Sequence, residues 1–135
     1  MNIRQEVELA ITAFANSQSP PIPVAYEGVT FVKPTTGPYL EVVFLDSSAM
    51  NATVDASRIR KFGTFQINCY VEDGHGMKSL DALTDNIIAL FPVNNKGLYT
   101  TFSVEQPANA SPTMSDAKFR MSAVRVDYRQ KPKQS

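Results

Sequence analysis

The apolar positions at the start of the chain recur at the spacing of a helix. They lie three or four residues apart, with polar residues between them: Ile3, Val7, Ala10, Ile11 and Phe14. This spacing predicts an amphipathic helix over about residues 2–16. Asn2, with Gln5 three positions later, has the pattern of a helix N-cap. Three prolines within residues 20–23 then require an extended segment, because proline is excluded from helix interiors.

A different period governs the middle of the chain. Between residues 64 and 72 apolar and polar side chains alternate strictly. One set is Phe65, Ile67, Cys69 and Val71, and the other is Gln66, Asn68, Tyr70 and Glu72. Alternation with a period of two predicts a strand with one packed face and one wetter face.

The remaining apolar segments complete the expected order of elements. A second helix is predicted over about residues 77–91, ended by Pro92. Further strands are expected at residues 24–26, 39–45, 98–106 and 118–129, with a loop at 107–112. Because the strands mostly follow one another without helical crossovers, the order predicts an α+β fold. We expect one domain over residues 1–135, with a mixed or mainly antiparallel sheet and two helices packed on one face.

Two segments fall outside this pattern. Residues 46–56 are small and polar, and they predict either a hairpin arm or a mobile loop. Residues 130–135 form a polar tail. The basic cluster Arg58, Arg60 and Lys61 directly follows the predicted arm. These side chains are the candidate interface residues, because basic groups can face phosphate or the acids of a neighbouring subunit.

Charge and composition narrow the functional classes. The 135 residues include 13 basic and 13 acidic side chains, so the net charge is zero. There is therefore no long-range attraction to nucleic acid or to anionic membranes, and no charge that opposes self-association. No apolar run approaches the length of a membrane span, and the N-terminus has no signal-peptide pattern. We expect a soluble protein made in the cytoplasm, where its single cysteine stays reduced.

Candidate chemistry is sparse. Cys69, His75 and Asp73 could form a nucleophilic Cys–His pair with an orienting acid. Cys69, however, lies on the apolar face of its strand, which favours a buried, unreactive thiol and a histidine in a turn. Asp81 and Asp85 lie one helical turn apart, and a solvent-exposed helix face explains them better than a metal site. With no phosphate-binding or catalytic motif present, we expect no cofactor, no metal and no enzyme activity.

Several short segments, taken in order, resemble one known family. They are residues 21–31 (PIPVAYEGVTF), 38–42 (PYLEV), 60–70 (RKFGTFQINCY), 83–91 (LTDNIIALF) and 125–129 (RVDYR). Their order and spacing resemble the tail terminator proteins of lambda-like siphophages. The resemblance covers nearly the whole chain, and it rests on order rather than on any catalytic fingerprint.

The resemblance implies a structural virion protein at the head-proximal end of a phage tail. Such proteins form a ring, expected here to be a homohexamer, that caps the tail tube and stops the tube protein from polymerising. The ring then meets the head-completion or connector proteins, and DNA passes through its lumen only as cargo. No membrane partner is implied. Arg58, Arg60 and Lys61 would face a neighbouring subunit or the lumen.

Other functions stay open at this point. The chain could be a head–tail connector or another tail-completion ring subunit, because those proteins also use small α/β folds. A small enzyme would need Cys69 or His75 to be reactive. A module that binds nucleic acid or a small ligand would show salt-sensitive affinity or a retained ligand.

Overall fold

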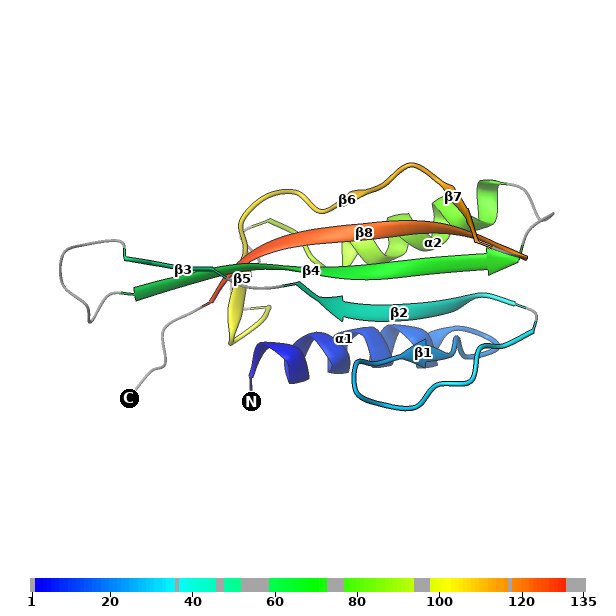
Figure 1. Ribbon diagram of the computed structural model, residues 1–135, viewed down its shortest axis with the longest axis horizontal. Helices are drawn as coiled ribbons and strands as arrows, with labels where there is room; N and C mark the ends of the chain where they lie inside the picture. Colours follow the sequence, from blue (N-terminus) through cyan, green and yellow to red (C-terminus); the bar gives the residue numbers. More distant parts are fainter. Residues whose placement is uncertain are drawn as a thin grey trace.

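The computed structural model describes residues 2–35, 37–45, 48–51, 59–72, 77–93, 98–116 and 118–130. At residues 48–51, 59–61, 77 and 116 it describes the backbone alone. In this part of the chain two helices and eight strands follow one another (Figure 1): α1 (Ile3–Ser17), β1 (Val24–Ala25), β2 (Tyr39–Phe44), β3 (Ser48–Asn51), β4 (Ile59–Glu72), α2 (Met77–Ala89), β5 (Phe102–Val104), β6 (Asn109–Ala110), β7 (Met114–Asp116) and β8 (Phe119–Gln130).

The strands form one mixed sheet in the order β1-β2-β4-β8-β5. The short strand β3 pairs with β4, and β6 and β7 pair with β8. Only β1 and β2 run parallel, whereas every other described pair is antiparallel. The predicted α+β domain with a mixed or mainly antiparallel sheet is therefore confirmed.

The centre of the sheet is the long antiparallel pair β4 and β8. Their register runs from Phe62 opposite Arg129 to Glu72 opposite Phe119. β4 contains the whole strand predicted over residues 64–72 and extends it toward the N-terminus, to Ile59. β8 agrees closely with its predicted range and gains Gln130, which the sequence assigned to the polar tail.

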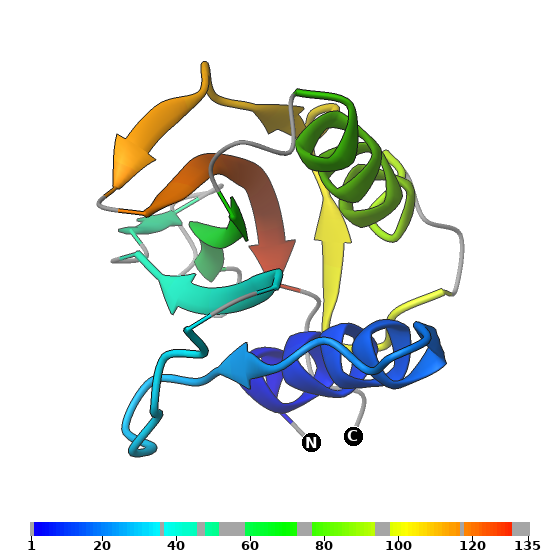
Figure 2. The ribbon, with the colours of Figure 1, turned by 90° about the vertical axis from the view of Figure 1, so that its right-hand side faces the viewer.

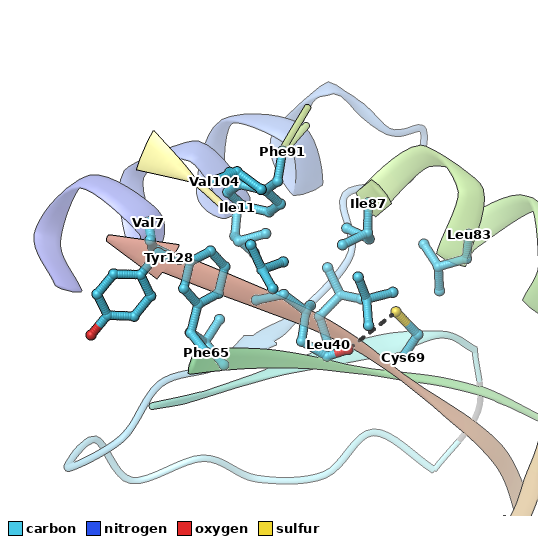
Figure 3. Packing of buried hydrophobic residues seen from close by; sticks show 14 of the residues in the cluster. Val7, Ile11, Leu40, Phe65, Cys69, Leu83, Ile87, Phe91, Val104 and Tyr128 are labelled. Atoms are coloured by element: carbon cyan, nitrogen blue, oxygen red, sulfur yellow. Dashed lines mark hydrogen bonds between the residues drawn. The ribbon is translucent and has the colours of Figure 1, made fainter. Parts of the chain in front are cut away.

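Both helices pack on the same face of this sheet (Figures 2 and 3), as predicted. Val7 and Ile11 of α1 and Leu83 and Ile87 of α2 all reach into one core cluster with the sheet residues, and Leu83 lies near Cys69. Ten members of this core are fully excluded from solvent: Val7, Ile11, Leu40, Phe65, Ile67, Cys69, Ile87, Phe102, Val124 and Val126. One continuous apolar core therefore joins the sheet to both helices.

The start of α1 follows the capping pattern in the sequence. The Asn2 side chain accepts a hydrogen bond from the Gln5 backbone N–H at 2.9 Å, and the Gln5 side chain accepts one from the Asn2 N–H at 2.9 Å. These reciprocal bonds satisfy donors that a helix N-terminus would otherwise leave unpaired. The helix ends at Ser17, one residue beyond the prediction.

Three further differences from the sequence analysis concern α2, β5 and β6. α2 ends at Ala89 instead of residue 91, because the N–H groups of Leu90 and Phe91 bond to carbonyls only three residues back. The strand expected over residues 98–106 shortens to β5. The loop expected over 107–112 contains the short strand β6 on the edge of β8.

The face of the sheet opposite the helices is more buried than the alternation predicts. At one end of it Tyr39, Tyr70 and Phe119 form a buried aromatic cluster, with Phe31 and Met121 packed against them. The rings of Tyr39 and Tyr70 stack at a centroid distance of 4.3 Å. Alternation within β4 predicts two faces correctly, but the aromatic partners come from segments distant in the sequence.

Candidate interaction surface

Cys69 is a core residue and not a reactive thiol. Its side chain is fully buried, and its sulfur lies 3.7 Å from the carbonyl oxygen of Ile67. Burial raises the pKa of the Cys69 thiol to about 12, so the nucleophilic thiolate is strongly disfavoured. The interpretation as a buried strand cysteine is confirmed. His75 and Asp73 lie outside the described residues.

The acidic pair on α2 faces solvent. Asp81 and Asp85 are both exposed, as the solvated-face interpretation predicts. Within the described ranges, no group of three or more His, Cys, Asp and Glu side chains is placed to hold a metal ion.

A two-stranded arm projects from one end of the molecule (Figure 1). We define the arm as β3 together with residues 59–62 of β4, which pair with it. β8 pairs with β4 only from Phe62 onward, so in the described part of the chain residues 59–61 are paired on one side only. A ribbon of two strands is marginally stable in water when nothing packs on it. The arm is therefore suited to a contact with another molecule.

The arm contains two of the three candidate interface residues. Arg60 pairs in register with Met50, and Lys61 with Ala49. Arg58 lies outside the described residues, as do residues 46, 47 and 52–56 of the segment for which the sequence predicts an arm or a loop. The described remainder of that segment is β3.

The edge of β2 is closed by a carboxylate that the sequence analysis did not identify. β1 pairs with the start of β2, and the Leu40 N–H donates to the Pro23 carbonyl at 3.0 Å. Beyond β1, the Phe44 N–H donates to the Glu27 carboxylate, which stands where the next strand residue would lie. The only sequence signal for this arrangement is the turn at Glu27 and Gly28, where Gly28 has a φ of +79°.

Arg4 holds this edge closure in place. Its guanidinium lies 3.2 Å from the Glu27 carboxylate and 4.6 Å from the centre of the Phe44 ring. The first turn of α1 is thereby linked to the end of β2. Carboxylate capping of this kind keeps a strand edge from pairing with another chain.

The far edge of the sheet is made of short pieces. β5, β6 and β7 lie in succession along β8, separated by Pro107 and Pro112. Three residues, 111–113, stand opposite two on β8, which is a β-bulge. The Ser111 N–H donates to the Ala123 carbonyl at 2.8 Å, and the Ser122 hydroxyl donates to the Ser111 carbonyl at 2.7 Å.

Polar side chains form a row on the face of the sheet opposite the helices. The Asn68 amide donates to the Glu41 carboxylate at 2.7 Å and accepts from the Gln66 amide at 2.7 Å. The Thr64 hydroxyl donates to Asp127 at 2.7 Å. Because most of these groups are hydrogen-bonded to one another within the row, the arrangement is that of a polar surface and not of a catalytic site.

A packed α+β domain with a capped β2 edge and a projecting two-stranded arm is suited to contacts with other chains. A family described as phage tail terminator protein matches residues 2–128. The chain therefore belongs to the phage tail terminator family, which gives it a structural role in phage tail completion and associates it with the virion.

The fold is also found among solved structures. One of fourteen matching chains superposes with a TM-score of 0.76 at 24% sequence identity, covering 98% of this chain and 96% of its own. At that identity the match establishes the shared fold. Curated protein sequences give no match. Among the described residues, no helix is long and apolar enough to cross a membrane.

Proposed function

We propose that the protein forms a ring that caps the tail tube, ends polymerisation of the tube protein and provides the surface for the head-completion or connector proteins. The observation that carries this proposal is the family match over residues 2–128. The arm supports it, because a ring needs subunits that contact one another head to tail. The proposed ring is a homohexamer, located at the head-proximal end of the tail, with DNA passing through its lumen as cargo.

Tube capping is tested with the tube protein of the same phage. Purified tube protein is polymerised in the presence of increasing amounts of this chain, and tube lengths are measured by electron microscopy. We expect shorter tubes with a ring of density at one end, and a particle mass near six times 14.9 kDa for the ring alone or on the tube. Tubes of unchanged length with no added end density would contradict the proposal.

The basic residues of the arm have a proposed part in this assembly. Arg58, Arg60 and Lys61 would face a neighbouring subunit or the lumen. Reversing the charge of Arg60 and Lys61 to glutamate is expected to weaken ring formation or head joining. The matched control reverses Lys78 and Lys118, which are exposed elsewhere on the domain. If both double variants assemble and join heads as the parent does, these residues have no interface role.

A further inference from the structure

We propose that the open edge of β3 pairs with the β6–β7 edge of a second copy of this chain, so that the sheet of one subunit continues into the next. The inference deepens the proposed function and rests on it, because it names the contact that would build the ring. It follows from five observations: the state of each sheet edge, the backbone orientation of β6, the direction of the strands, the positions of the two edges and the local charges.

The first observation is that most edges are already occupied. Glu27 caps β2 beyond β1, and Pro20, Pro21 and Pro23 flank β1 itself. β5 lies against the helices, with Phe102 and Val104 in the shared core. In the described part of the chain, β3 pairs only with β4, and β6 and β7 pair only with β8. Two edges therefore remain for strand addition.

The backbone of β6 is oriented for such a contact. Because Ser111 directs its N–H toward Ala123 of β8, the alternation of an antiparallel strand turns the N–H and C=O of Ala110 outward. Asn109 and Ala110 are both exposed. Within the described residues, no strand pairs with the outer side of β6.

Strand direction makes the two edges compatible. Going across the sheet, β3, β4, β8 and β6 are each antiparallel to the one before. β3 and β6 therefore run in opposite directions within one subunit. A neighbour that is brought alongside without being turned over presents its β6 antiparallel to β3, which is the pairing that continues the alternation.

The two edges also lie at different positions along the long axis of the molecule. In Figure 1 the arm projects at one end of the long axis, whereas β7 lies near the other end. Contact between them displaces successive subunits along a common direction, and such a head-to-tail contact can close into a ring. Pairing of β3 with β3 would instead be isologous and would stop at a dimer.

Charge favours the head-to-tail arrangement. The arm contains Arg60 and Lys61 and no acid, so it has a formal charge of +2. Residues 109–116 contain Asp116 and no basic residue, so their charge is −1. Joining β3 to β3 would bring two arms of like charge together, whereas joining β3 to the β6–β7 edge brings a positive arm beside a negative segment.

The test is a disulfide scan in assembled rings. Single cysteines at Ser48, Ala49, Met50 or Asn51 are each combined with a cysteine at Asn109 or Ala110, in the full chain with Cys69 retained in its buried site. Facing residues of antiparallel strands have Cα atoms about 4.5–5.5 Å apart, within the roughly 4.4–6.8 Å that a disulfide spans. We expect at least one combination to give a reducible ladder of multimers on mild oxidation.

Matched controls separate this contact from others. Each β3 cysteine is also tested alone and together with Ala82→Cys, which places a thiol on the exposed face of α2. Neither control is expected to give a ladder. Rings that form but never cross-link between β3 and β6 would overturn the inference and leave the proposed function standing. Dimers from a β3 cysteine alone would also overturn it.

A backbone variant gives an independent readout. Ala110→Pro removes the outward N–H and leaves the Ser111 bond to β8 in place, whereas Ala110→Val keeps the donor. We expect only the proline variant to lose ring assembly, with circular dichroism and melting temperature close to the parent. Normal rings from Ala110→Pro would contradict the inference. If the parent itself never forms a ring with or without tube protein, the proposed function fails and the inference fails with it.

Discussion

Glu6 joins parts of the protein that are far apart in the sequence. Its carboxylate accepts hydrogen bonds from the backbone N–H groups of Thr100 and Thr101, both at 2.9 Å, and from their hydroxyls at 3.0 and 2.7 Å. Burial alone would raise the pKa of Glu6, but these hydrogen bonds outweigh it and leave the pKa below its ordinary value near 4.5. Through these hydrogen bonds the ionised carboxylate links α1 to the segment that leads into β5.

Acid titration tests this contact. Because the folded-state pKa of Glu6 is lowered, its contribution to stability is present above about pH 4.5 and is lost as the pH falls through the folded-state value. At pH 7, Glu6→Ala is expected to lower the free energy of unfolding by about 1–3 kcal/mol. Urea unfolding between pH 7 and 3 should show a smaller acid dependence for Glu6→Gln than for the parent. Equal acid dependence of the two proteins would mean that Glu6 contributes nothing to the loss of stability at low pH.

The burial of Cys69 allows a second prediction about a single side chain. Its burial and its pKa near 12 predict negligible reaction with a thiol reagent at pH 8 while the protein is folded. The thiol should react at once in denaturant. A variant with Ala13→Cys, exposed on α1, supplies a control thiol that reacts rapidly in the folded state. Rapid modification of Cys69 in the native parent would show that this part of the core opens readily.

At the scale of elements, β2 depends on a side chain to close its edge. Glu27→Ala removes the acceptor of the Phe44 N–H and the partner of Arg4. We expect this variant to self-associate through the exposed edge, seen as an increase in mass in light scattering at rising concentration. Glu8→Ala, which removes a carboxylate from α1 instead, should not change the concentration dependence. The prediction fails if the two variants behave alike.

Elements set by local pattern could be predicted, whereas those set by distant partners could not. The alternation around Phe65 and the cap at Asn2 both act within a few residues, and both are found in the structure. β6 and β7 have no such pattern, because β8 supplies all of their described strand pairing. The Glu27 cap is also invisible in the sequence, since its partner Phe44 is seventeen positions away.

The arm was predicted only in part, and its role as an interface stays a prediction. The small, polar residues 46–56 predict a hairpin arm or a mobile loop, and the structure places β3, Arg60 and Lys61 in a two-stranded arm. Which edges remain open depends on the whole sheet, because β2 is capped and β5 is drawn into the core. That property could not be derived from the residues of the arm alone.

At the scale of the whole molecule, one core holds both helices and the sheet. Ile11 of α1 and Ile87 of α2 are both fully buried in it. We expect a single cooperative unfolding transition, shifted by either Ile11→Ala or Ile87→Ala at a cost of about 2–5 kcal/mol each. Calorimetry would contradict a shared core if one substitution moved only part of the transition.

The long pairing of β4 with β8 has a consequence during synthesis on the ribosome. β4 and the whole arm are translated well before β8, yet β8 supplies the strand on which β5, β6 and β7 assemble. A partly translated chain can thus expose its arm but has no completed edge with which to receive a neighbour's arm. If β3 docks on the β6–β7 edge as proposed, the order of the strands along the chain delays this docking until β8 has been made and the domain has folded.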